Sequence, residues 1–129
     1  MLAADLHRLL KEQEKLFRFP DVDRLTVFSD NVLPAVLREL GILRVAPAVL
    51  ERISKGESLK AAEQVDTELR AAAIVACEEI VTLARSDEYA VLGLGNLNSM
   101  VLDYYVWKVG KEPRFRSVPR HSTQDTIFY

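Results

Sequence analysis

Apolar residues recur at helical spacing along most of this chain. In the first segment, residues 3–17, charged side chains alternate with one apolar stripe made of Leu6, Leu9, Leu10, Leu16 and Phe17. Apolar positions three and four residues apart are typical of an amphipathic helix. The predicted helix ends before the segment FRFPDVDR, because Pro20 disfavours helical geometry at the residue before it and the neighbouring aspartates favour a loop.

Two short helices are predicted next, each closed by a glycine. In the segment DNVLPAVLRELG, Asp30 is a suitable N-cap, Pro34 lies within or near the first turn, and Gly41 stands at the expected end. The segment APAVLERISKG repeats this order, with Pro47 suited to a first helical position and Gly56 as the terminator. Two successive units of helix and glycine predict hairpin-like packing.

The longest predicted helix runs from about residue 61 to residue 85. Its small and apolar positions recur at steps of three and four, namely Val65, Leu69, Ala72, Ala73, Ala76, Ile80 and Leu83. Gly93 and Gly95 then break the chain, and the segment NLNSMVLDYYVWKVG predicts a final helix rich in aromatic residues. The tail KEPRFRSVPRHSTQDTIFY has two prolines and no period, so we expect a loop that packs through its aromatic end. The pattern as a whole predicts an all-α, compact helical domain.

Composition favours a single domain over residues 1–129. A chain of 129 residues with 49% hydrophobic residues can bury a core without disulfides or metals. Its 17 basic and 19 acidic residues leave a net charge of -2, so no global positive field attracts a long nucleic acid. The single cysteine, Cys77, has no partner for a disulfide or a zinc site, which favours a reducing compartment. The N-terminus lacks the apolar run of a signal peptide or a membrane span, so we expect a cytoplasmic protein with no membrane partner.

Asp30 is the first candidate for chemistry, because it follows an apolar run and begins a predicted helix. A carboxylate at a helix N-terminus is stabilised as an anion by the free N–H groups and by the helix dipole. An anion held there could stabilise a cationic transition state or act as a nucleophile. The same two features also describe a plain N-cap with no role in catalysis.

Asp103 is the second candidate, because it lies between Leu102 and Tyr104 in a predicted helix that looks buried. A buried carboxylate must find donors, since leaving it unpaired costs several kcal/mol. The donor could be the amide edge of a bound heterocycle. It could equally be an arginine elsewhere in the fold, for example Arg70.

The remaining candidates have ordinary explanations beside the functional ones. His121 is the only histidine in a non-helical segment, and it neighbours side chains that can donate to an anion. Glu68 and Arg70 lie two positions apart, hence on different helix faces, where such side chains are commonly solvated. Neither histidine has a partner at metal-ligand spacing, so no metal site is predicted. The C-terminal third is rich in aromatic residues, which either pack in the core or stack on a planar base: Tyr104, Tyr105, Trp107, Phe128 and Tyr129.

Four stretches in order carry a resemblance to a known family. They are LTVFSDNVLPAVL, DTELRAAAI, LDYYVWK and VPRHSTQDTIFY. Together, residues 25–129 resemble the C-terminal half of the queuosine salvage family, the queuosine 5'-phosphate N-glycosylase/hydrolases. The resemblance implies a helical fold related to the helix-hairpin-helix DNA glycosylases. It also implies hydrolysis of the N-glycosidic bond of queuosine 5'-phosphate, or a related nucleotide, to release the base queuine without a metal or organic cofactor.

The resemblance further implies roles for individual residues. Asp30 matches the aspartate of the family's Phe-Ala-Asp-Tyr-Arg motif, the central catalytic acid, which would stabilise or trap the ribosyl oxocarbenium ion as the base departs. Asp103 matches the aspartate of an Asp-Tyr-Tyr-x-Trp stretch and is assigned to the base or to positioning. The other residues assigned to substrate binding are Phe28, Arg70, Tyr104, His121 and Tyr129.

The chain also departs from the family pattern. Asn31 and Val32 stand where the family has Tyr-Arg, Ala35 replaces a usual glutamine, and Lys108 replaces an acid. Family members carry a long N-terminal half that contributes one wall of the pocket, so one expectation is a second chain or a homodimer partner that completes it. These departures keep open a second hypothesis, a non-catalytic helical binding or assembly domain that retains the scaffold. A helical interaction module unrelated to the family is the third.

Overall fold

The structure is a computed structural model of the chain and describes residues 2–60 and 63–125. Most of the described residues are helical. The helices and strands in chain order are α1 (Leu2–Leu10), η1 (Lys15–Phe17), η2 (Val22–Arg24), α2 (Val32–Glu39), α3 (Pro47–Ser54), β1 (Ser58–Lys60), α4 (Gln64–Ala84), η3 (Asp87–Leu92), α5 (Ser99–Val109), α6 (Pro113–Arg116) and β2 (Ser122–Gln124). The elements labelled η are 3-10 helices.

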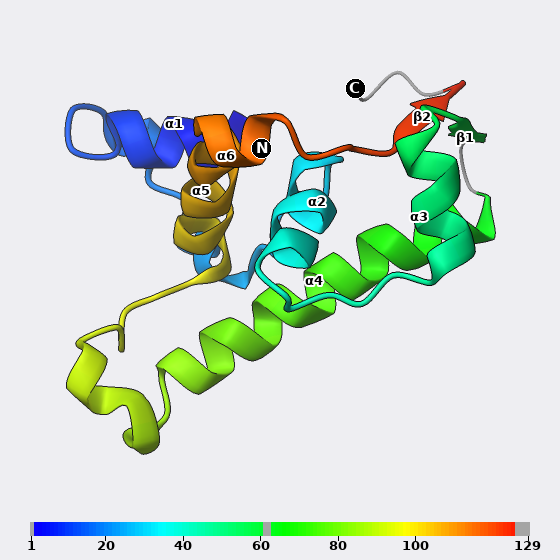
Figure 1. Cartoon of the computed structure of the whole chain (residues 1–129). Helices are drawn as coiled ribbons and strands as arrows, with labels where there is room; N and C mark the ends of the chain where they lie inside the picture. Colours follow the sequence, from blue (N-terminus) through cyan, green and yellow to red (C-terminus); the bar gives the residue numbers. More distant parts are fainter. Residues whose placement is uncertain (1, 61–62, 126–129) are drawn as a thin grey trace.

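The long helix α4 is the element on which the others are assembled. Figure 1 shows α2 lying against its middle, α3 and the small sheet at its beginning, and the η3 segment beyond its end. The buried residues of α4 recur every four positions, at Leu69, Ala73, Cys77 and Val81. This spacing places them on one face of the helix. Leu69 and Ala73 belong to the apolar face that the sequence predicted, whereas Ala72 and Leu83 of that predicted face are exposed.

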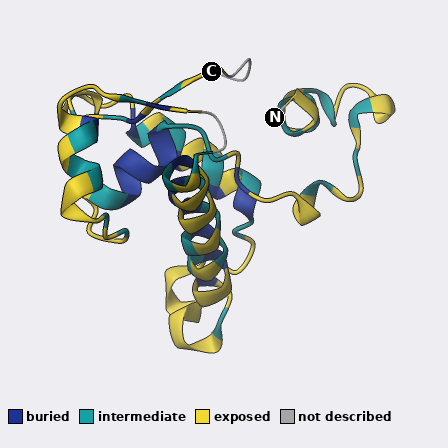
Figure 2. Cartoon of the chain, turned by 90° about the vertical axis from the view of Figure 1, so that its right-hand side faces the viewer, coloured by how far each residue is buried: buried dark blue, intermediate teal, exposed yellow. Residues whose placement is uncertain are grey.

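The main core lies where α2, α4 and α5 meet. The side chains of Leu33 and Leu37 from α2 are each 1% exposed, and they belong to one buried cluster with Cys77 of α4 and Leu102 of α5. Figure 2 shows this concentration of buried residues around α2 and α4. The helices approach closely because Gly110 follows α5 where a Cβ atom would collide with a methyl group of Val32.

The predictions of the four internal helices are confirmed, within a few residues at each end. Pro47 is the first residue of α3, as predicted. The glycines after α2 and α3 adopt the left-handed conformation, with φ of 77° at Gly41 and 70° at Gly56. A glycine reaches this conformation without the steric cost of a Cβ atom, so both glycines end their helices as expected.

The prediction of one helix over residues 3–17 is wrong in its second half. The helix α1 ends at Leu10, and residues 15–17 form the separate 3-10 turn η1. No residue of α1 is buried, so its apolar stripe lacks the packing that would extend a helix of this length. His7 is half-buried, and its Nδ1 accepts a bond of 3.0 Å from the N–H of Phe19, which folds the chain back along the helix.

The prediction that residues 111–129 form only a loop is wrong in part, whereas the prediction of a mostly helical domain is confirmed over the described residues. Residues 113–116 form the short helix α6, whose Phe115 is buried in the main core. Residues 122–124 form β2, which pairs in parallel with β1 in the register Ser58 to Ser122. The fold is therefore mostly helical with one small two-stranded sheet. Phe128 and Tyr129 lie outside the described residues, so the predicted packing of the aromatic terminus stays a prediction.

None of the helices in the described ranges is long and apolar enough to cross a membrane.

Candidate functional site

Asp30 lies directly before α2 and caps it. Its Oδ1 atom accepts bonds from the N–H groups of Val32 at 2.7 Å and Leu33 at 3.2 Å. Asn31 occupies the formal N-cap position and makes no capping bond with its side chain, so Asp30 takes over that role. The predicted capping role of Asp30 is therefore confirmed, one residue before the formal N-cap position, and the half-buried carboxylate is held in a defined place.

Asp103 reaches from α5 to the segment before α2. Its Oδ1 atom accepts a bond of 2.9 Å from the main-chain N–H of Phe28. The carbonyl of the same Phe28 accepts a bond of 2.9 Å from the N–H of Asp30. The carboxylate of Asp103 and the main chain of Asp30 are thus bonded to the two sides of the Phe28 backbone.

The environment of Asp103 favours its neutral form. Burial raises the pKa of Asp103 to about 6, the bond from Phe28 opposes this rise, and the negative charge of Asp30 adds to it. A carboxyl group with such a pKa is protonated in a minority of molecules at pH 7, so it can donate as well as accept a proton. Strongly shifted carboxyl groups are common in active sites, although structural ion-pair networks shift them too.

Arg70 belongs to a partly buried polar cluster with Asp66, Ser29 and Thr123. Its Nε atom lies 3.0 Å and 3.1 Å from the two carboxylate oxygens of Asp66, and its Nη1 atom donates to the Ser29 carbonyl at 2.7 Å. Its Nη2 atom donates to the Thr123 hydroxyl at 3.0 Å. The expectation that Arg70 is solvated is wrong, because its side chain is only 14% exposed. The salt bridge of Arg70 is with Asp66, so the alternative that paired it with Asp103 is not the one observed.

His121 is brought beside the same cluster. His121 is 3% exposed, and its Nε2 atom lies 3.5 Å from Oδ1 of Asp66. This nitrogen has no hydrogen-bond partner among the described residues. Burial and the nearby charge of Arg70 lower the pKa of His121, so the ring is neutral at pH 7. The main-chain carbonyl of His121 accepts a bond of 3.2 Å from the side chain of Asn31, which joins the last strand to the beginning of α2.

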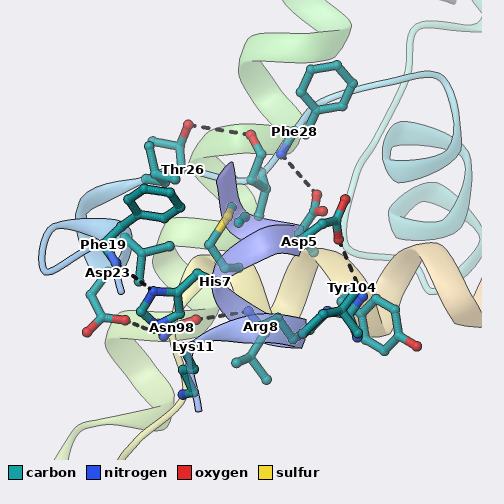
Figure 3. A pocket seen from close by; sticks show the side chains of 18 of the residues that line it. Asp5, His7, Arg8, Lys11, Phe19, Asp23, Thr26, Phe28, Asn98 and Tyr104 are labelled. Carbon is teal, nitrogen blue, oxygen red and sulfur yellow. Dashed lines mark hydrogen bonds and ion pairs between the residues drawn. The ribbon is translucent and has the colours of Figure 1, made fainter. Parts of the chain in front are cut away.

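A pocket of about 1050 Å³ lies between α1, the segment that follows it, and α5. Three of the predicted substrate-binding residues line it, namely Phe28, Asp103 and Tyr104. Figure 3 shows the lining residues, with a dashed line for the hydrogen bond that the Phe28 N–H donates to the carboxylate of Asp103. It also shows His7 beside Phe19. Within the described part of the chain, Asp30, Arg70 and His121 are not in the lining.

Aromatic and cationic side chains form one side of this pocket. The rings of Tyr104 and Trp107 are stacked, with centroids 6.4 Å apart, and the guanidinium of Arg8 lies 4.4 Å from the centroid of Tyr104. Tyr104 is 40% exposed and Tyr105 is 64% exposed, so neither is a core residue. For these two tyrosines, the alternative of core packing is wrong.

Asp66 is the residue of this region that sequence reasoning missed. It is 5% exposed, and Thr123 donates to its Oδ1 atom at 2.9 Å. Burial opposes ionisation of Asp66, but the bonds from Arg70 and Thr123 outweigh it and lower its pKa. The only local signal was the spacing of four between Asp66 and Arg70 on one helix face. In the parts of the chain that the structure describes, no group of three or more histidine, cysteine or acidic side chains could hold a metal ion.

Comparison with known proteins assigns the chain to a family. The sequence model of a family described as queuosine salvage protein matches residues 1–129. This chain belongs to the queuosine salvage protein family. The match confirms the resemblance seen in the sequence and extends it over the first 24 residues, which lay outside the predicted range 25–129.

Individual relatives of the chain carry names that agree with this family assignment. The chain is 35% identical over 121 residues to the queuosine 5'-phosphate N-glycosylase/hydrolase of Nematostella vectensis, covering 86% of this chain and 35% of the relative. It is 34% identical over 129 residues to that of Sphaerobacter thermophilus, covering 100% and 38%. For the Bos taurus protein of that name, the identity is 33% over 116 residues, with 86% and 33% covered. The chain spans about a third of the length of these relatives.

Asn31 and Val32, which depart from the expected family pattern, each make contacts that fit this fold. Asn31 stands where the family was expected to have tyrosine, and its side chain donates to the His121 carbonyl. Val32 stands in place of an arginine and is buried in the main core beside Gly110. Both residues therefore fit the fold of this chain.

Proposed function

We propose that this chain carries an active site that hydrolyses the N-glycosidic bond of queuosine 5'-phosphate, or of a related nucleotide, and releases queuine. The observation that carries the proposal is that the Asp103 carboxylate, in the lining of an aromatic pocket, and the main-chain N–H of Asp30 both bond to the backbone of Phe28. The printed names of the relatives support the choice of substrate.

Asp30 is the catalytic residue of this proposal. Both of its capping bonds use Oδ1, and no hydrogen bond to Oδ2 is made by the described residues. As the bond between C1' and the base nitrogen breaks, its electron pair leaves with the base and positive charge develops on the ribose. The carboxylate stabilises this charge, or it forms a covalent bond to C1' that breaks again when water attacks. Water forms the new C1'–O bond and passes its proton to the Asp30 carboxylate.

Asp103 serves the departing base. A carboxyl group whose pKa lies at about 6 holds a proton in part of the molecules near neutral pH, and a proton is what the base nitrogen needs as it leaves. The same group can hydrogen-bond the polar edge of the heterocycle. Asp103 therefore positions the base, and protonation of the base is the step that its raised pKa suits.

The aromatic pocket takes the planar base. Tyr104 offers an exposed ring that stacks with Trp107, and aromatic faces hold heterocycles by offset stacking. Phe28 lines the same pocket next to Asp103, and we keep it as a contact of the base. His121 and Tyr129 stay proposed contacts of the ligand, whereas the bonds of Arg70 suit it to holding the segment before Asp30.

The test is release of queuine from queuosine 5'-phosphate, measured by liquid chromatography and mass spectrometry. A full-length relative serves as the positive control, and this chain is assayed alone and with candidate partner chains. We expect release by the wild-type chain and none by Asp30→Asn, which keeps the side-chain size and removes the charge. Absence of release under conditions in which the relative turns over would reject the enzymatic function.

One observation favours a second candidate, a non-catalytic domain that binds queuine or its nucleotide. Asp30 is engaged in capping α2, and neither Asp30 nor His121 lines the pocket within the described residues. Calorimetry separates the two candidates, because a scaffold of this kind would bind queuine and release none. The same titrations, with size-exclusion chromatography and light scattering, test whether a second chain or a homodimer completes the pocket.

A further inference from the structure

A partly buried polar cluster next to Asp30 in the chain joins three segments that are remote in sequence. We call it the Asp66 cluster, and it consists of Asp66 and Arg70 of α4, Thr123 of β2, and Ser29 of the segment before α2. The reaction proposed above gives Asp66 no chemical role. The cluster is nevertheless well bonded, and Asp66 is 5% exposed.

The carboxylate of Asp66 organises the guanidinium of Arg70. Arg70 meets both oxygens of Asp66 through Nε, at 3.0 Å and 3.1 Å, and its Nη2 atom also lies 3.0 Å from Oδ1. The Thr123 hydroxyl accepts from Arg70 and donates to Asp66, which closes the cluster. A buried guanidinium needs such a partner, because removing one charge of a buried pair leaves the other uncompensated.

The oriented guanidinium in turn holds Ser29. Its Nη1 atom donates to the Ser29 carbonyl at 2.7 Å, and the Ser29 hydroxyl donates to the Arg70 carbonyl at 3.1 Å. Ser29 is thereby tied to α4 by its main chain and by its side chain. The next residue is Asp30, so the peptide that precedes the catalytic carboxylate is fixed to the central helix.

We propose that Asp66 is a positioning residue, which acts through Arg70 to fix the Ser29 backbone and so the carboxylate of Asp30. This inference rests on the proposed function for its consequence in catalysis, but its structural part does not. A displacement of about 1 Å at a reacting group can lower the rate on the order of 100-fold. A cluster that only stabilised the fold would leave the turnover of the folded chain unchanged.

The experiment compares Asp66→Asn with Glu79→Gln in the full chain. Both variants exchange a carboxylate of α4 for an amide, but Glu79 is exposed. Hydrogen exchange is followed at the amides of Val32 and Leu33, which the Asp30 side chain protects. The amide of Val101 is the internal control, because the side chain of Asn98 caps it in the same way at the start of α5.

We expect Asp66→Asn to speed exchange at Val32 and Leu33 about tenfold or more and to leave Val101 unchanged, with Glu79→Gln like the wild type. In the queuine assay, kcat should fall on the order of 100-fold while KM changes little. Equal protection at Val32 in wild type and Asp66→Asn would overturn the proposal. So would an unchanged kcat in an active chain.

A second pair of variants decides the matter if Asp66→Asn loses protection throughout the chain. Thr123→Val removes the hydroxyl from the Asp66 cluster, whereas Thr123→Ser retains it. The proposal requires faster exchange at Val32 in the valine variant and recovery in the serine variant, and equal exchange in the two overturns it. If the wild-type chain releases no queuine, the proposed function fails, and the exchange data still decide whether Asp66 positions Asp30.

Discussion

Replacement of Asp103 by asparagine should stabilise the folded chain at neutral pH and not at about pH 4. Burial raises the pKa of Asp103 to about 6 from an ordinary value of 3.8. Between these two values the folded chain retains a proton that the unfolded chain has released. The free energy of unfolding of the wild type therefore contains a term that falls as pH rises from about 4 to about 6.

The size of this effect follows from the pKa shift. A rise of about two pKa units corresponds to about 3 kcal/mol of preference for the neutral side chain. Water reaches part of the half-buried Asp103 and screens its charge, so we expect roughly half of this value, ~1–2 kcal/mol, as the gain of Asp103→Asn above about pH 7. The asparagine oxygen can still accept the bond from Phe28.

The assay is urea unfolding at about pH 4 and at about pH 7.5, followed through the fluorescence of Trp107, the single tryptophan. Asp87→Asn, at an exposed carboxylate, controls for the change in net charge. The difference between Asp103→Asn and the wild type should grow with pH, whereas that of the control should stay small. A difference that is the same at both pH values, or that shrinks as pH rises, would refute the assigned environment of Asp103.

Three further predictions concern single residues. Asp30→Ala should cost about 1 kcal/mol through loss of the cap, whereas Asp30→Asn should retain most of this stability in thermal unfolding and still release no queuine. Gly110→Ala should lower the unfolding free energy by about 1–3 kcal/mol, because the new methyl group meets Val32, while Gly95→Ala, with no atom within 4 Å, should change it little. Burial raises the pKa of Cys77 to about 11, so iodoacetamide should label this thiol at about pH 8 only after unfolding, and rapid labelling of the folded chain would contradict its burial.

The internal helices were readable from the sequence because their signals are local. Apolar spacing, Pro47 at a first helical position and Gly41 and Gly56 after the last turns act within one or two turns of a helix. The cap at Asp30 was readable for the same reason, since its bonds reach only two and three residues ahead. The pattern misjudged residues 11–17, where the apolar stripe has no partner surface.

The small sheet and the surroundings of the carboxylates depended on the tertiary structure. Strands β1 and β2 have three residues each, too short to show alternation, and they pair only because the folded chain brings Ser58 beside Ser122. That pairing also carries Thr123 to Asp66 and Arg70. Nothing near Asp66 in the sequence could reveal Thr123 as its partner.

The sequence by itself thus determined where the four internal helices lie, that Asp30 caps one of them, and which family the chain resembles. Only the tertiary structure decided that Asp103 bonds to Phe28, that Arg70 holds Ser29, and that the pocket is lined by Asp103 and not by Asp30. The physical reason is the range of the interactions. Helices and caps form between residues a few positions apart, whereas burial and the bonds that shift a pKa depend on segments that meet only in the folded chain.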